Sequence, residues 1–274
     1  MSADSDIKYL HRIAESRCKV PTIHDPTTLL RLLKQEALAF REPDSSKLRE
    51  LTDRFRDCQE AFERGPYSKE LKESIVGFYI ILDECFFFKT LTRAVYFKTL
   101  SKIMKNIPTR ITGLVELRFV EQQDPNDGLR GRWNPFDRII DLYLGGADGA
   151  TTFPVERVLV TVLHECVHAF LDLFVDRRHP DMRLIKEPNG HGPIFLDIFQ
   201  SIGLKIKEIT HSRSWEEKFY LSLEFLDGGR LGGGGVPGAA DYRADDRHLP
   251  PRDSHYHPHD RRVPPRDRNF PPRD

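Results

Sequence analysis

The pentapeptide HECVH, residues 164–168, carries the residue types with the clearest chemistry in this chain. In a helix, His164 and His168 project from one face a single turn apart, so both imidazoles can reach one tetrahedral ion. Glu165 is offset from that face, outside the ligand shell but close enough to act as a general base beside the ion. This pattern is typical of zinc hydrolases. The structural alternative is two core histidines bonded to the backbone, with Glu165 in an ion pair.

A catalytic zinc usually takes three protein ligands, so the pentapeptide predicts a third ligand elsewhere. The longer motif that supplies it from the same helix is absent, because Phe174 stands where its histidine would be. The candidates downstream are His179, in a charged turn, Glu187, and His191. We favour His191, because glycines flank it in NGHGPIF and Pro193 then opens another helix, which would hold it firmly.

Helices are expected on both sides of this chemistry. Residues 27–64 predict two helices, the second with apolar residues at spacings of three and four, ended by Gly65–Pro66. A third apolar stripe over residues 71–85 leads into three consecutive phenylalanines, which we expect in the core. The helix that opens at Pro193 is expected to stop at Gly203.

Two segments before the motif alternate apolar and polar residues, as a half-buried strand does. They are VELRFVE, residues 115–121, and RIIDLYL, residues 138–144. Between them lies QQDPNDGLRGRWNP, which is rich in turn-forming residues. This pattern predicts an antiparallel pair or meander with a flexible connection.

Composition limits the possible partners. Lys plus Arg and Asp plus Glu each number 42 in 274 residues, so the net charge is zero and gives no overall attraction to nucleic acid or membrane. The four cysteines form no CxxC pair, which argues against a thiolate zinc site or a disulfide framework. No apolar run approaches the roughly 18 residues of a spanning helix, and the N-terminus lacks a secretory signal. We expect an intracellular protein with no membrane partner.

The composition changes abruptly from about residue 227. Lys and Glu are absent there, Gly, Pro, Arg and Asp dominate, and the unit PPRD recurs. Such a segment cannot bury enough apolar surface to offset its chain entropy. We therefore expect a disordered tail over residues 227–274.

The two stretches HECVHAF and NGHGPIF together resemble the SprT-like metallopeptidases, which include the Spartan-type DNA–protein crosslink proteases. In that family the active-site helix reads HExxHA and a later helix opens with GHGPxF. The likeness covers roughly residues 68–205, including the strand-forming GRWNPFDRIIDLYL. It implies an α+β, zincin-like fold with a small antiparallel sheet. It further implies Zn²⁺ held by His164, His168 and His191, with Glu165 as the catalytic base.

The likeness also implies a function and a domain organisation. Many members carry a four-cysteine zinc ribbon that helps some of them bind DNA, but no cysteine follows Cys166 here, so a DNA partner rests on the likeness alone. We expect a zinc-dependent endopeptidase acting on protein substrates, including those crosslinked to or bound on DNA, in the nucleus or cytoplasm. The alternative is a catalytically silent, zinc-stabilised adaptor module in chromatin or DNA repair. The expected parts are an N-terminal helical extension, a metallopeptidase domain and the tail, over residues 1–66, 67–226 and 227–274.

Overall fold

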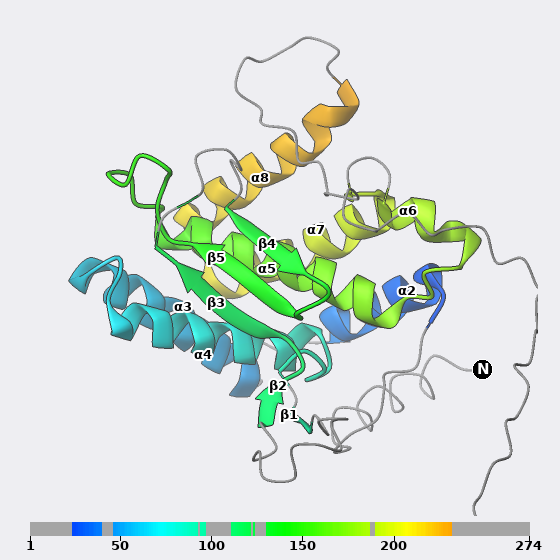
Figure 1. The fold of residues 1–274 in the computed structure, drawn as a ribbon, viewed down its shortest axis with the longest axis horizontal. Helices are drawn as coiled ribbons and strands as arrows, with labels where there is room; N and C mark the ends of the chain where they lie inside the picture. The colour runs from blue at the N-terminus through cyan, green and yellow to red at the C-terminus, as the bar shows by residue number, and fades with distance from the viewer. Residues whose placement is uncertain are drawn as a thin grey trace, which may run out of the picture. The chain divides into compact units, whose positions relative to one another are not determined.

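The computed structural model describes residues 24–39, 46–92, 94–96, 111–121, 123, 130–186 and 190–231 (Figure 1). The elements, in chain order, are α2 (Pro26–Ala39), α3 (Ser46–Arg64), α4 (Lys69–Phe86), β1 (Ala94–Tyr96), β2 (Ile111–Gly113), β3 (Glu116–Val120), β4 (Gly131–Asn134), β5 (Ile139–Tyr143), α5 (Val155–Phe174), the short 3₁₀ helix η1 (Pro180–Met182), α6 (Arg183–Lys186), α7 (Pro193–Thr210) and α8 (Arg213–Leu231). The fold is therefore mixed α+β.

The main sheet has three strands in the order β3-β5-β4. The strands predicted at 115–121 and 138–144 are confirmed as β3 and β5, but the antiparallel pairing predicted for them is wrong, because β3 runs parallel to β5. The segment GRWN lies at the end of the turn-rich connection by composition, whereas the family resemblance includes it in a strand-forming stretch. It forms β4 and takes the antiparallel place beside β5. With one side of β5 occupied by this hairpin, β3 pairs with the other side, and the sheet is mixed. A separate antiparallel pair joins β1 and β2.

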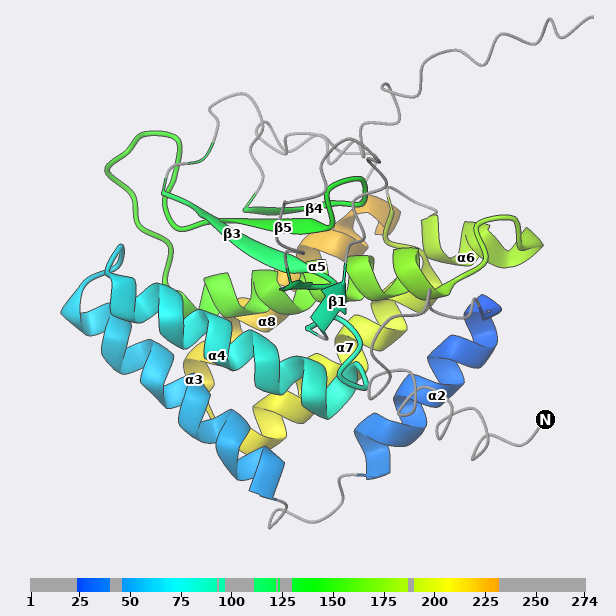
Figure 2. The same ribbon diagram turned by 60° about the horizontal axis from the view of Figure 1, so that its bottom comes forward.

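Helix α5, which carries HECVH, lies at the centre of the helical layer. It contacts β4 and β5 on one side and α3, α4, α7 and α8 on the others, and Figures 1 and 2 show it between the sheet and the remaining helices. Its buried residues extend around most of its circumference, as expected of a helix enclosed by a core. Ile140 and Leu142 of β5 are fully buried in this same core.

The helices predicted before the sheet are confirmed. Helix α3 buries the stripe Leu48, Leu51, Phe55, Cys58 and Ala61, and Ser68 caps α4 by accepting a hydrogen bond from the backbone N–H of Leu71. The three consecutive phenylalanines, residues 86–88, are buried as expected. The residues of α2 and α3 belong to the same hydrophobic core as those of α5 and α7.

The predicted stop at Gly203 is wrong, because α7 continues to Thr210 and ends at His211 in the left-handed conformation. Gly203 is needed for packing: a Cβ placed there would lie 2.0 Å from the Phe219 ring of α8. Helix α8 also continues through residues 227–231, beyond the expected start of the tail. Each residue added to an existing helix gains one backbone hydrogen bond, which carries the helix past the change in composition. The remainder of the tail, residues 232–274, lies outside the described residues.

Within the described part of the chain, none of the helices combines the length and the apolar character needed to cross a membrane.

Candidate metal centre and active site

Three histidine side chains converge on one point. Helix α5 presents His164 and His168 one turn apart, and the segment before α7 supplies His191. The three Nε2 atoms are each 3.1 Å from the other two. Of the candidates for a third ligand, the structure thus brings His191 to the helical pair. These residues, called the histidine cluster below, are close enough to bind one metal ion.

Hydrogen bonds among the three imidazoles do not explain this geometry. The Nε2 of a neutral imidazole is either a donor or an acceptor, so among three mutually adjacent Nε2 atoms at least one pair is of like kind. A single cation, in contrast, accepts a lone pair from all three nitrogens. The donor set therefore fits a metal ion, and imidazole nitrogen suits zinc and other late first-row metals.

The buried ring of Phe195 packs against all three residues of the histidine cluster. The Phe195 ring centroid lies 5.0 Å from that of His164, 4.3 Å from His168 and 4.8 Å from His191. Phe195 is itself fully buried. Gly192 allows the chain to pass close behind, since a Cβ there would lie 2.2 Å from the Leu184 carbonyl oxygen. These contacts fix the direction from which the ring of His191 enters.

Of the two other candidates for the third ligand, His179 does not join the cluster. The Nδ1 of His179 accepts a hydrogen bond from the backbone N–H of Asp181, at 3.2 Å, and so caps the 3₁₀ helix η1. Glu187 lies outside the described residues.

Burial keeps the histidine cluster neutral. Loss of solvent lowers the pKa of each imidazole below its ordinary 6.5, to about 4 for His191. Repulsion from neighbouring rings lowers the pKa of His164 and His168 further. Metal ligation needs the neutral form of imidazole, so these shifts leave the nitrogen lone pairs available across the neutral pH range.

Glu165 lies on the side of α5 that faces the sheet. Its side chain is buried, and Oε2 accepts a hydrogen bond of 2.9 Å from the backbone N–H of Trp133 in β4. Burial raises the pKa of Glu165 to about 8; the Trp133 hydrogen bond lowers it, and the nearby Asp141 raises it. The strand approaches this closely because residue 131 is glycine, where a Cβ would lie 3.1 Å from Cγ of Glu165.

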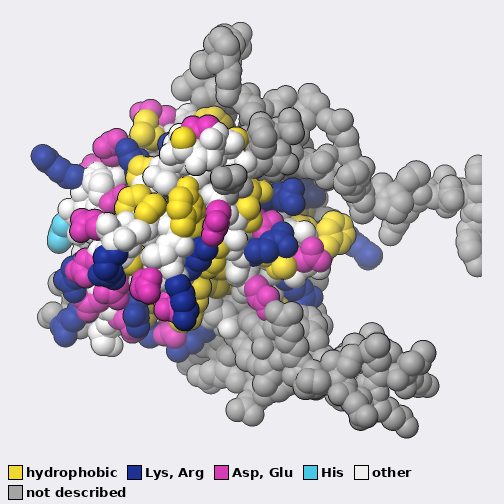
Figure 3. Space-filling view, turned by 60° about the vertical axis from the view of Figure 1, so that its left-hand side comes forward, with side chains coloured by type: hydrophobic (Ala, Val, Ile, Leu, Met, Phe, Trp, Pro, Cys, Tyr) yellow, Lys and Arg dark blue, Asp and Glu magenta, His cyan; other side chains and the backbone are white. Residues whose placement is uncertain are grey.

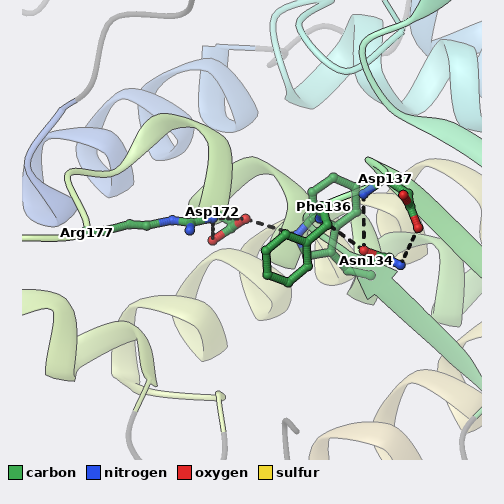
Figure 4. A network of polar contacts seen from close by, with 6 residues as sticks. Asn134, Phe136, Asp137, Asp172 and Arg177 are labelled. Atoms are coloured by element: carbon green, nitrogen blue, oxygen red, sulfur yellow. Dashed lines mark hydrogen bonds and ion pairs between the residues drawn. The ribbon is translucent and has the colours of Figure 1, made fainter. Parts of the chain in front are cut away.

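Sequence reasoning missed the residues that join β4 to α5. The indole Nε1 of Trp133 donates to Oδ2 of Asp172 at 3.3 Å, and Arg177 in turn donates to both oxygens of Asp172 (Figure 4). The available signal was the alternation of Gly131 and Trp133 in GRWN, which places both on the face toward α5. It was hidden by the surrounding turn-forming residues.

Comparison with protein-family models, with curated proteins and with solved structures finds no match for this chain. The geometry of the site therefore carries the functional inference.

Proposed function

We propose that this protein is a zinc-dependent endopeptidase of the SprT-like type. The convergence of the histidine cluster beside Glu165 carries the proposal. Three nitrogens bound to one tetrahedral zinc at about 2.0–2.1 Å lie roughly 3.3 Å apart, and the Nε2 atoms here are 3.1 Å apart. Three protein ligands leave the fourth position open, which distinguishes catalytic from structural zinc sites. An active-site helix beneath a small sheet supports a zincin-like fold.

Glu165 is suited to moving a proton during peptide hydrolysis. Zinc in the site would supply Lewis acidity, activating water and polarising the peptide carbonyl. Glu165 would take the proton from the attacking water and deliver it to the leaving amine. Two features of the structure support accepting the proton and then donating it. The Trp133 hydrogen bond favours the carboxylate, and burial favours the carboxylic acid.

The position of β4 supports a protein substrate. In the described sheet β4 is an outer strand, paired only with β5, and it runs beside Glu165. An extended peptide can add to such an edge through backbone hydrogen bonds. The peptide bond would then lie near the general base.

DNA-bound proteins are the substrate class that the sequence resemblance suggests. On the face drawn in Figure 3, Lys and Arg side chains lie among Asp and Glu side chains, and neither sign gathers into a patch. This mixture agrees with the zero net charge of the chain. The described residues on this face therefore offer no basic surface for DNA, and action on DNA-bound proteins would require access to the nucleus.

Elemental analysis paired with a cleavage assay tests the proposal. The wild-type chain should carry about one zinc, as expected of a mononuclear site. His191→Ala should lose the metal, and His179→Ala, a histidine outside the cluster, should keep it. Glu165→Gln should keep zinc and lose cleavage of an unstructured protein and of a DNA-bound protein.

Two outcomes would contradict the proposal. Zinc without cleavage of either substrate would favour the adaptor module, because the metal would then serve only to stabilise the fold. Absence of zinc after purification without chelators would make the histidine cluster a structural feature.

A further inference from the structure

Trp133 connects β4 to α5 at two points. Its backbone N–H donates to Oε2 of Glu165 at 2.9 Å, and its indole N–H donates to Oδ2 of Asp172 at 3.3 Å. Glu165 and Asp172 are seven residues apart on α5, which places them on the same side of the helix, two turns from each other. A single residue of the strand therefore bridges the candidate general base and a second carboxylate.

Arg177 fixes the second carboxylate. Its Nη2 lies 2.7 Å from both oxygens of Asp172, and Figure 4 shows the guanidinium and the carboxylate facing each other. A charge-assisted contact of this kind restricts the carboxylate and so directs Oδ2 toward the indole. The Arg177 side chain is 60% exposed. Since exposed ion pairs add little to global stability, removing this one should act locally.

The far end of β4 is also ordered. Oδ1 of Asn134 accepts hydrogen bonds from the backbone N–H groups of Phe136 and Asp137, and its Nδ2 donates to Asp137 (Figure 4). The turn after β4 is thus closed by its own contacts. The strand is held directly to α5 by the two hydrogen bonds of Trp133 and by the close packing of Gly131 against Thr161 and Glu165.

We propose that Asp172 and Arg177 form a latch that holds Trp133 against α5 and thereby sets the position of Glu165. They are positioning residues, because they act through Trp133. The latch is useful because an outer strand has ladder hydrogen bonds on one side only and opens more readily than a central strand. A base displaced by about 1 Å can lose on the order of 100-fold in rate.

Amide hydrogen exchange at position 133, measured by NMR on the full chain, tests the latch without any activity assay. Trp133→Phe keeps the backbone donor and the apolar ring but removes the indole N–H. Asp172→Ala removes the acceptor. Each should speed exchange at position 133 by about tenfold, the loss expected for one hydrogen bond to a charged group. Combining the two should add little, because both remove the same contact.

A neighbouring arginine provides the matched control. Arg177→Gln should also speed exchange at position 133, whereas Arg178→Gln removes an equal charge from the next residue and should not. Amides of β5 and the denaturation midpoint should stay near wild type in all variants. Unchanged exchange at position 133 in both Trp133→Phe and Asp172→Ala would overturn the latch. If Asp172→Ala does not fold, Trp133→Phe alone decides.

The catalytic consequence rests on the proposed function and is measured separately. With the zinc content unchanged, Trp133→Phe and Arg177→Gln should lower kcat by about tenfold or more and leave KM within about twofold, because β4 keeps its outer edge for the substrate while its distance from the base changes. A lower zinc content or a higher KM at constant kcat would contradict a positioning role. Faster exchange at position 133 in a protein that cleaves nothing would support the latch and refute the proposed function.

Discussion

Replacing Gly131 by alanine should push β4 away from Glu165. A Cβ at this position would lie 2.6 Å from Cγ2 of Thr161 and 3.1 Å from Cγ of Glu165. Thr161 cannot simply rotate, because its hydroxyl donates to the carbonyl oxygen of Arg157 at 2.9 Å. The strand and α5 must therefore separate locally.

The expected loss of stability follows from these distances. Ordinary van der Waals contact begins near 3.4 Å, so the methyl-to-methyl distance must grow by about 0.8 Å. The 2.9 Å hydrogen bond between Trp133 and Glu165 would then stretch to about 3.7 Å, beyond the useful range. Overpacking costs about 1–3 kcal/mol, and losing a hydrogen bond to an uncharged carboxyl costs about 0.5–1.5 kcal/mol. Allowing for relaxation, we expect a loss of roughly 3 kcal/mol, or about 6–12 °C in Tm for a domain of this size.

Urea denaturation of the variant measures this loss, and a second substitution identifies its cause. Thr161→Ser removes the obstructing methyl group but keeps the hydroxyl, so Gly131→Ala combined with Thr161→Ser should recover most of the stability lost. The histidine cluster is formed by α5 and the segment before α7, so the zinc content of all these variants should match wild type.

Two results would refute this reasoning. Wild-type stability in Gly131→Ala would mean that the strand already has room. A double variant as unstable as the single one would mean that the methyl group of Thr161 is not the obstacle.

Two further predictions concern the scaffold. Gly203→Ala should destabilise the fold by several kcal/mol, because the added Cβ would enter the Phe219 ring. Gly77→Ala should instead stabilise the fold by about 0.5–1 kcal/mol, because the Cβ meets only the flexible Arg54 side chain. Denaturation curves that shift both variants in the same direction would contradict this. Burial raises the pKa of Asp83 to about 7 from 3.8, against four hydrogen bonds from residues 90–92. The folded chain thus holds this proton more tightly than the unfolded chain, so the associated stability is complete below pH 3.8 and is lost as the pH rises through about 7. The free energy of unfolding of wild type, relative to Asp83→Asn, should fall over that interval, and a rise would show that the hydrogen bonds outweigh burial.

The parts of the fold that follow from local patterns were predictable. Apolar stripes identified α3 and α4, and the spacing of His164 and His168 identified the helical half of the histidine cluster. The pattern alone left several candidates for the third ligand, and only the return of the chain before α7 brings His191 to the pair.

The errors lie where structure depends on distant partners. The four residues of β4 show a single period of alternation within a turn-rich segment, too short to indicate a strand. The place of β3 depends on which side of β5 is already occupied, and its direction depends on the path of the chain from β3 to β4. No local pattern contains that information. Glycine is a residue type that often ends a helix, but Gly203 is needed because the Phe219 ring of the next helix packs against it. The contact between Trp133 and Asp172 likewise joins residues 39 apart in the chain.

Burial shifts the pKa values of the histidines and of Glu165 in opposite directions, and this has a measurable consequence. It lowers the pKa of the histidine cluster and raises that of Glu165 to about 8. Without an ion, the site at pH 7 is therefore uncharged, with three neutral imidazoles and one protonated carboxyl. A dication would favour the carboxylate and lower its pKa.

Zinc uptake at pH 7 should therefore release close to one proton from Glu165, about 0.9 for a pKa one unit above the working pH. The imidazoles contribute almost none, since they are already neutral. At pH 9 the same carboxyl is largely ionised beforehand, so its release should fall to about 0.1. Calorimetric titration of the metal-free chain in buffers of different ionisation enthalpy counts these protons. Subtracting the value for Glu165→Gln removes protons from other sources, such as water. Equal release by wild type and Glu165→Gln at pH 7 would mean that Glu165 is ionised before the metal arrives, and that the Trp133 hydrogen bond outweighs burial in setting its charge.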